Sequence, residues 1–154
     1  MRFSIVASLT LLAAAGAIAA PLSKGAALKI MHQRHEGMEA VGKANKVLRR
    51  EVTADAPDVT AVRGAARDMA KLAGQSSKWF PKGTGPEIGK TGAKPEIWQK
   101  PADFSARLRD FQGAAKQLNA AAASGDINAI KARYGDLGKT CKACHETFRS
   151  EMKH

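Results

Sequence analysis

Apolar residues recur at steps of three and four along most of this 154-residue chain, and this spacing is typical of α-helices. No stretch of useful length alternates apolar and polar residues in the way that a half-buried strand does. The pattern predicts four amphipathic helices, over residues 22–52, 57–80, 104–122 and 127–148. The candidate core positions are, in chain order, Ala27, Met31, Met38, Val41, Leu48, Val59, Val62, Ala66, Met69, Ala73, Phe104, Leu108, Phe111, Ala115, Leu118, Ala122, Ile127, Ile130, Tyr134, Leu137, Cys141, Cys144 and Phe148.

Two short breaks and one long break separate these segments. Pro57 suits the first turn of the second helix, and Asp126 can cap the fourth. The long break, residues 81–101, reads PKGTGPEIGKTGAKPEIWQKP, and its glycines and prolines predict irregular structure. A connection of this length in a small domain is expected to pack against the domain. The sequence therefore predicts an all-α fold, an antiparallel four-helix bundle with one long crossover loop.

The first residues have the pattern of a secretory signal peptide. Arg2 is followed by a largely apolar run up to Ile18, and small residues close this run as AIAAP. Cleavage after Ala19 removes residues 1–19 and leaves residues 20–154 as one domain. An uncleaved anchor is the alternative, but the run is short for a membrane span and no second run follows. We therefore expect a periplasmic protein without stable membrane insertion.

The only two cysteines, Cys141 and Cys144, lie in the sequence CKACH. A disulfide between them would close a very small loop and would constrain the unfolded chain little, so a structural disulfide does not explain them. C-x-x-C-H is the attachment signature of haem c. The thiols add to the two vinyl groups of the porphyrin, and His145 then binds the iron from one face. Residues three apart share one side of a helix, so both cysteines can reach the same haem edge.

Two other interpretations of this motif carry less weight. A zinc site needs four ligands, and the chain has no second closely spaced pair to complete one. The remaining candidate zinc ligands are His32, His35, His145 and His154. A thioredoxin-like dithiol follows a strand at the start of a helix, whereas this pair lies late in a predicted helix. The motif therefore predicts one haem c, attached near the C-terminus.

Four segments of the chain point to a known family. They are LKIMHQRHEGMEAVGKANK at 28–46, WFPKGTG at 79–85, KPEIW at 94–98 and KACHETFR at 142–149. Together these segments resemble the class II cytochromes c, the cytochrome c′ family, over essentially the whole of the mature chain. The resemblance implies a four-helix bundle that carries haem c near its C-terminus, and cytochrome c′ is itself a standard example of such a bundle.

The ligand on the other side of the iron decides the function. The candidates are Met31, Met38, Met69, Met152, His32 and His35. Met152 lies beyond His145 on the same helix, and Met31 and Met38 lie seven residues apart on one face, so periodicity does not choose between these two. The resemblance implies Met31, which matches the methionine ligand of the low-spin branch. In the high-spin branch an arginine precedes the matching position by four residues, and this chain has Ala27 there.

Ligation by His145 and Met31 would raise the reduction potential and predicts a one-electron carrier. The alternative is a five-coordinate, cytochrome c′-like protein that binds nitric oxide or carbon monoxide. No positioned nucleophile, acid–base pair or phosphate loop is recognisable, so we expect no enzymatic activity.

The net charge of +11 bears on the partners of the protein. Outside the cytoplasm it favours redox proteins with acidic surfaces over nucleic acid. The resemblance also implies a possible homodimer through the first two helices. The basic residues Lys43, Lys46, Arg49 and Arg50 would oppose such pairing through repulsion.

Overall fold

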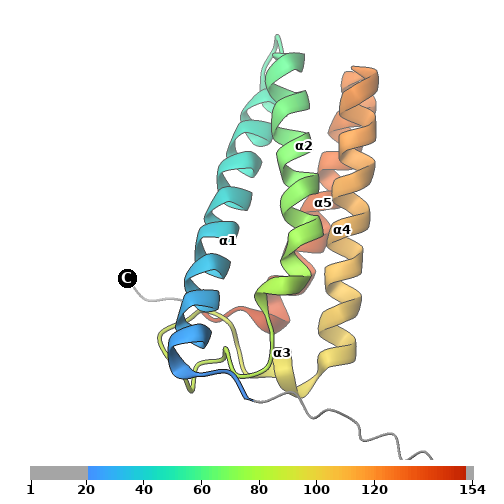
Figure 1. The fold of residues 1–154 in the computed structure, drawn as a ribbon. Helices are drawn as coiled ribbons and strands as arrows, with labels where there is room; N and C mark the ends of the chain where they lie inside the picture. The colour runs from blue at the N-terminus through green and yellow to red at the C-terminus, as the bar shows by residue number, and fades with distance from the viewer. Residues whose placement is uncertain (1–20, 152–154) are drawn as a thin grey trace, which may run out of the picture.

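The computed structural model describes residues 21–151 as a bundle of four long helices (Figure 1). These helices are α1 (Lys24–Thr53), α2 (Val59–Gln75), α4 (Pro101–Ser124) and α5 (Ile127–Phe148). Two one-turn helices, η1 (Ser76–Trp79) and α3 (Glu96–Gln99), flank the long connection. This architecture confirms the predicted four-helix bundle. None of the helices described within residues 21–151 is both long enough and apolar enough to span a bilayer.

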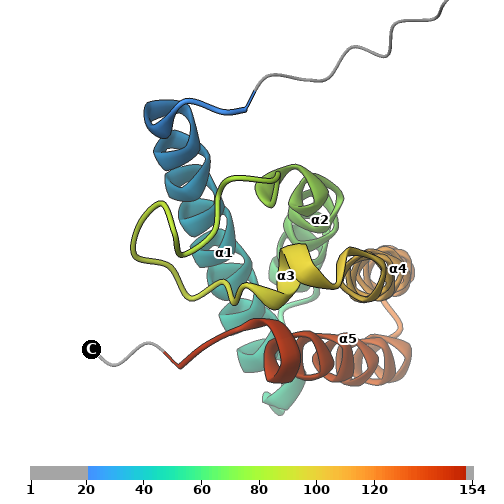
Figure 2. The same ribbon diagram turned by 90° about the horizontal axis from the view of Figure 1, so that it is seen from below.

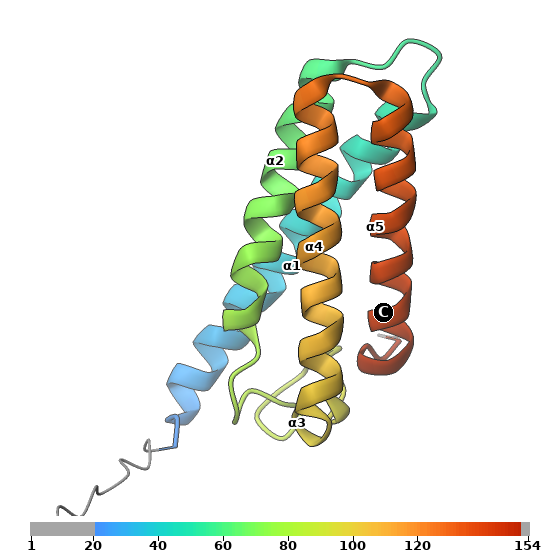
Figure 3. The ribbon, with the colours of Figure 1, turned by 90° about the vertical axis from the view of Figure 1, so that its right-hand side faces the viewer.

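The bundle is closed on three sides and more open on the fourth. Seen from the loop end, α2 lies between α1 and α4, and α5 lies beside α4 (Figure 2). The pairs α1–α2, α2–α4 and α4–α5 make many contacts, whereas α1 and α5 make few. α1 and α5 run in opposite directions and separate towards the loop end (Figure 3). The open side therefore lies between α1 and the C-terminal half of α5.

Local capping determines where the helices begin and end. Ser23, Asp58 and Asp126 precede α1, α2 and α5, and a side-chain oxygen of each accepts a hydrogen bond from a backbone amide of the first turn. The predicted Asp126 cap is thus confirmed. α4 ends at Gly125, whose φ of 79° is the left-handed conformation that glycine adopts without strain.

The second helix ends earlier than the sequence predicts. We expected it to continue to Phe80, but α2 stops at Gln75 and the 3₁₀ turn η1 follows. The Ser76 hydroxyl donates a hydrogen bond to the Ala73 carbonyl at 2.7 Å, which competes with the helical hydrogen-bond pattern. Pro81 further disfavours the helical conformation of the residue before it. The chain therefore leaves α2 about one turn early.

A buried carboxylate joins α1 to α2. Glu51 is 6% exposed, and its Oε2 accepts a hydrogen bond from the backbone N–H of Asp58 at 2.9 Å. Its Oε1 accepts a hydrogen bond from the Arg50 guanidinium at 2.7 Å. The Asp58 amide and then Arg50 lower the pKa of Glu51 below its ordinary value, so the carboxylate stays charged at neutral pH. The Glu51 carboxylate therefore holds the short turn between α1 and α2.

The hydrophobic core has two parts. The larger part fills the bundle and includes Leu48, Val62, Met69, Leu118, Ile130 and Leu137. The smaller part lies at the loop end, where the Phe104 ring contacts the rings of Phe80 and Phe148 edge-on, with centroids 4.8 and 5.2 Å apart. Most predicted core positions are buried or half-buried. Met38 is the exception, because it faces the open side and is 36% exposed.

Gly37 in α1 allows the Trp79 ring to pack directly on the helix backbone. A Cβ atom added at Gly37 would lie 2.5 Å from the Trp79 ring, and Trp79 is only 8% exposed. Gly42, on the same helix, would place its Cβ in open space, with nothing within 4 Å. Two glycines that look alike in the sequence thus have opposite packing environments.

We expect Gly37→Ala to destabilise the protein by about 1–3 kcal/mol, because Trp79 must move out of its packed position. The matched control, Gly42→Ala, is expected to stabilise it by about 0.5–1 kcal/mol through helix propensity. Urea unfolding followed by circular dichroism measures both changes. Equal effects of the two substitutions would contradict the packing of Trp79 on Gly37.

Candidate functional site

The cysteine pair lies on the inward side of α5, near its C-terminal end. Both thiols are free and half-buried. Cys141 packs against the larger core, and Cys144 packs against the smaller core with Phe104 and Phe148. Being one helical turn apart, both side chains project from neighbouring points of one helix side. A rigid helix therefore presents two sulfur atoms at the border between the two cores.

The environment of the thiols disfavours the redox interpretation. Burial raises the pKa of Cys141, and burial followed by the proximity of Cys141 raises the pKa of Cys144. Thiols with raised pKa values are poor thiolates, whereas a redox dithiol needs a lowered pKa. Among residues 21–151, no three His, Cys, Asp or Glu side chains gather into a metal-binding group of the kind that zinc requires. Both findings favour covalent haem attachment over the two alternatives.

His145 follows Cys144 directly, near the C-terminal end of α5. His145 as a whole is exposed. Partial burial of its imidazole nevertheless lowers the pKa of His145, and the positive charge of Arg149 lowers it further. A lowered pKa favours the neutral imidazole, whose free nitrogen lone pair is what an iron ion binds. His145 therefore has the protonation state that an axial ligand needs.

The relative register of α1 and α5 can be read from one hydrogen bond. The Tyr134 hydroxyl donates to the Asn45 Oδ1 at 3.1 Å and links the two helices above the open side. At 1.5 Å per residue, His145 lies about 16 Å further along α5 from Tyr134. The same distance from Asn45 back towards the N-terminus of α1 leads to Arg34, which lies between Met31 and Met38 in the sequence. The register thus brings both methionines close to the level of His145.

Burial separates these two methionines. Met31 is 8% exposed, whereas Met38 is 36% exposed. The long loop crosses Met31, because a Cβ atom added at Gly89 would lie 3.6 Å from the Met31 Cε. Met31 is therefore the sulfur-bearing side chain that is covered on the α1 side of the opening.

Three other candidate ligands, Met69, His32 and His35, have different surroundings. Met69 is enclosed in the larger core and is 1% exposed. His32 and His35 are exposed and pair with Glu36 and Glu39, each at 3.3 Å. Met152 lies outside the described residues, as does His154.

The residues on the open side fit a haem. α1 and α5 have few contacts of their own there, and α1 leaves the apolar side chains Leu28 and Met38 exposed, at 43% and 36%. A large apolar ring held by two thioethers on α5 would cover apolar surface that the chain alone does not bury. The three positions Cys141, Cys144 and His145 lie on one end of one helix, as the motif requires.

The crossover loop packs against the domain, as its length predicted, and Arg34 contributes to this contact. Arg34 has one signal in the sequence, a charged residue at an inward position of the first helix. Its hydrogen-bond partners were not predicted, because Thr84 and Thr91 lie in the irregular segment and Trp79 lies where the second helix was expected to continue.

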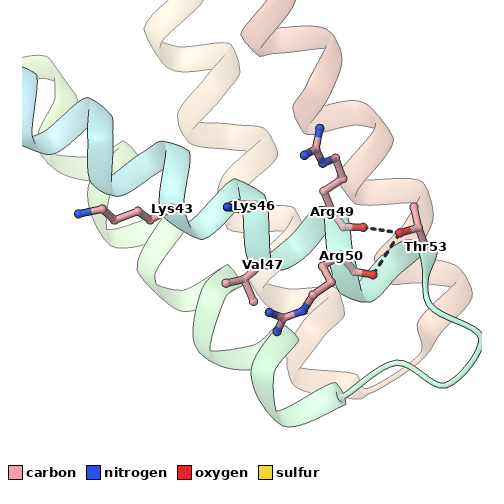
Figure 4. Close-up of a pocket in the computed structure, with 6 residues that line it drawn as sticks. All are labelled: Lys43, Lys46, Val47, Arg49, Arg50 and Thr53. Carbon is pink, nitrogen blue, oxygen red and sulfur yellow. Dashed lines mark hydrogen bonds between the residues drawn. The ribbon is translucent and has the colours of Figure 1, made fainter.

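A basic hollow of about 460 Å³ lies on the α1 surface towards the far end from the loop (Figure 4). Lys43, Lys46, Arg49, Arg50 and Thr53 line it, together with the apolar Val47. Among the described residues only Arg50 of these four cations has a carboxylate within 4.0 Å, that of Glu51. The hollow is therefore a concentrated positive surface.

Comparison with known proteins gives a consistent result. The sequence profile of the family described as Cytochrome C′ matches residues 29–149. The cytochrome c′ of Allochromatium vinosum is 36% identical over 143 residues, which cover 90% of this chain and 89% of that protein. The crystal structure of cytochrome c′ from Thermochromatium tepidum superposes with a TM-score of 0.76 at 31% identity, and the match covers 86% of this chain and all of that chain. A nitric oxide complex of a variant of cytochrome c′ from Alcaligenes xylosoxidans superposes with a TM-score of 0.72 at 28% identity, over 83% of this chain and 97% of that chain.

We expect the mature protein, made in a host with haem-attachment machinery, to exceed its chain mass by one haem. The double variant Cys141→Ser, Cys144→Ser is expected to have the chain mass alone, because a hydroxyl does not form the thioether. Mass spectrometry after extraction with acidified acetone makes the measurement. Each single variant, which keeps one thioether, is the control. A wild-type protein with the bare chain mass would contradict haem attachment.

Proposed function

Because the chain belongs to the cytochrome c′ family, we propose that it is a mono-haem c-type cytochrome whose iron keeps one coordination position open to a small gas molecule. The family binds haem c, and the two cysteines near the C-terminus fit its attachment motif. Bound haem supplies an iron that exchanges one electron and binds small diatomic ligands. The observation that carries the proposal is the family match over residues 29–149 together with the free cysteine pair on α5.

The protein holds the cofactor through α5 in this proposal. Cys141 and Cys144 would hold the haem through two thioethers, and the His145 imidazole would be the protein ligand of the iron. The Phe104 and Phe148 rings pack beside Cys144 and would exclude water from the attachment edge. Covalent attachment would keep the cofactor in place even though α1 and α5 make few contacts.

The comparisons support the open position better than ligation by Met31. Cytochromes c′ are typically five-coordinate, so membership of this family does not support the low-spin His/Met branch that the resemblance of the first helix implied. The Alcaligenes xylosoxidans relative is described as a nitric oxide complex. Gas binding therefore becomes the leading proposal, in place of the dedicated electron carrier that we expected from the sequence. The relatives' names indicate no catalytic activity.

The one-electron carrier remains a second candidate because of a specific observation. Met31 is a nearly buried thioether on α1, close to the level of His145 on the facing helix. A methionine in that position could also be ordinary apolar packing, since methionine often fills irregular gaps. Spectroscopy of the haem-loaded protein distinguishes the two candidates.

We expect the ferric wild-type protein to be high-spin, without the near-infrared charge-transfer band of methionine-ligated iron, and its ferrous form to bind carbon monoxide. Met31→Leu, which keeps the side-chain volume, is expected to leave both properties almost unchanged. Met38→Leu is the matched control. A near-infrared band that disappears in Met31→Leu and persists in Met38→Leu would contradict the open coordination position. It would identify Met31 as the iron ligand and favour the electron-carrier function.

The proposal includes export to the periplasm, with cleavage after Ala19. Residues 1–20 lie outside the described part of the chain. The support is the charged start, apolar run and small-residue end of the leader sequence.

The basic hollow on α1 is the proposed docking surface for an acidic protein partner. Three unpaired cations, Lys43, Lys46 and Arg49, attract a negative surface and repel a second copy of the same face. Structures of the family include dimers, one of them described as dissociating under ligand control. In this chain the repulsion favours a different partner over self-association through α1.

We expect amide chemical shifts of the labelled protein to change mainly within residues 43–53 when an oligoglutamate peptide is added. The reversal Lys43→Glu, Lys46→Glu is expected to remove most of this response, because it replaces attraction by repulsion. Lys116→Glu, an exposed change on α4, is the matched control. Shift changes spread evenly over the surface, or equal in all three proteins, would contradict docking at the hollow.

A further inference from the structure

Arg34 is a buried cation on α1 whose guanidinium contacts both arms of the crossover loop. The side chain is 4% exposed. Its Nη2 donates to the Thr84 carbonyl at 2.9 Å and to the Thr91 hydroxyl at 3.1 Å. Its Nη1 donates to the Thr84 hydroxyl at 3.2 Å and to the Trp79 carbonyl at 3.3 Å. Four hydrogen bonds therefore run from one residue of α1 to the segment 79–91.

All four acceptors are uncharged. Within the described residues no carboxylate lies within 4.0 Å of Arg34, and the charge is instead met by the faces of Phe80 and Trp98, with centroids at 5.1 and 5.9 Å. Burial without a carboxylate lowers the pKa of Arg34. Burying a charge is costly unless it is fully hydrogen-bonded, so the loop conformation and the Arg34 position depend strongly on each other.

The second arm of the loop continues from Thr91 to the end of α5. The Lys94 amide donates to the Phe148 carbonyl at 3.0 Å, and the Ser150 amide donates to the Gly92 carbonyl at 2.9 Å. These bonds pair Ala93 with Arg149 in a short antiparallel bridge, four residues after His145. The loop is thus attached to α1 through Arg34 and to α5 through its backbone.

The middle of the loop lies on Met31. A Cβ atom at Gly89 would lie 3.2 Å from the Leu28 Cδ2 and 3.6 Å from the Met31 Cε, so the loop backbone approaches α1 closely. Figure 2 shows the loop crossing α1 and returning past the end of α5 to α3. The loop therefore bridges the two helices at the end where they separate.

We propose that Arg34 is a positioning residue that holds the loop 81–95 over Met31 and so limits the access of small ligands to the iron from the α1 side. This inference rests on the proposed function, since it concerns the open coordination position. Arg34 acts through the loop and does not itself contact the iron in this account. The planar fork with its several donors explains why arginine is needed, because lysine has the charge but not the geometry to hold both arms.

The test uses the haem-loaded protein and the variant Arg34→Leu, with two measurements. Hydrogen exchange of the amides in residues 84–94 is expected to become about tenfold faster or more, because each hydrogen bond from a charged donor contributes at least about a decade in equilibrium constant. The association rate of carbon monoxide with the ferrous protein is expected to rise by a similar factor. Arg34→Lys is expected to recover only part of each property.

Arg63→Leu is the matched control. Arg63 also donates to backbone carbonyls, those of Ala122 and Ala123 at 3.0 and 3.3 Å, but it does so at the far end of α4. This variant is expected to lose stability without changing the exchange of the loop or the carbon monoxide rate.

Thr91→Val is the milder variant where Arg34→Leu does not fold. It removes the hydroxyl that accepts from Arg34 and also from the Ala93 amide, each at 3.1 Å, so the Ala93 amide is left out of its exchange comparison.

Unchanged loop exchange in both Arg34→Leu and Thr91→Val would overturn the proposal, and so would faster exchange with an unchanged carbon monoxide rate. Equal effects of Arg63→Leu on the rate would also overturn it, because the change would then follow stability alone. A wild-type protein that carries haem but takes up no carbon monoxide would contradict the proposed function, because the iron would then have no open coordination position. Hydrogen exchange of the loop amides would still decide whether Arg34 holds the loop.

Discussion

The separation of α1 from α5 at the loop end is the constraint on which the rest of the structure depends. Three sides of the bundle are closed by helix packing, and the fourth is joined by the Tyr134–Asn45 hydrogen bond above the opening and by the crossover loop at its end. α1 also leaves the Leu28 and Met38 side chains partly exposed. Haem attached to the free thiols of Cys141 and Cys144 would cover apolar surface on the side where α1 and α5 separate.

The two sides of the opening are built by different means. On the α5 side the cysteines and His145 follow one another along a single helix, so their relative positions are determined by helix geometry alone. On the α1 side the surface is assembled from a helix, a loop and a buried arginine that lie far apart in the sequence. The first arrangement is rigid because it is local. The second depends on contacts between distant segments, because the loop that covers Met31 is held by Arg34 on α1 and by its pairing with Arg149 after the end of α5.

This difference explains what the sequence could predict. The helices follow from the period of apolar residues, and the attachment site follows from the spacing C-x-x-C-H. The early end of α2 is accompanied by a hydrogen bond from Ser76 back to Ala73, which the apolar pattern does not report. Met31 and Met38 share one face of α1, so only the register against α5 and the path of the loop separate them. The partners of Arg34 lie in a segment without periodicity, and they become visible only when the loop is folded onto the helix.

Covalent attachment is what allows the α1 side to vary. A haem held by a single histidine, as in globins, relies on the surrounding pocket to enclose it. Two thioethers to α5 lessen that reliance, so the residues of α1 and the loop can vary in what they place beside the iron. We propose that the choice between gas binding and electron transfer depends on the Met31 side chain and on the loop that Arg34 holds over it. The two candidate functions thus differ on the α1 side, where an irregular segment crosses the helix, whereas both use the cysteine pair on α5.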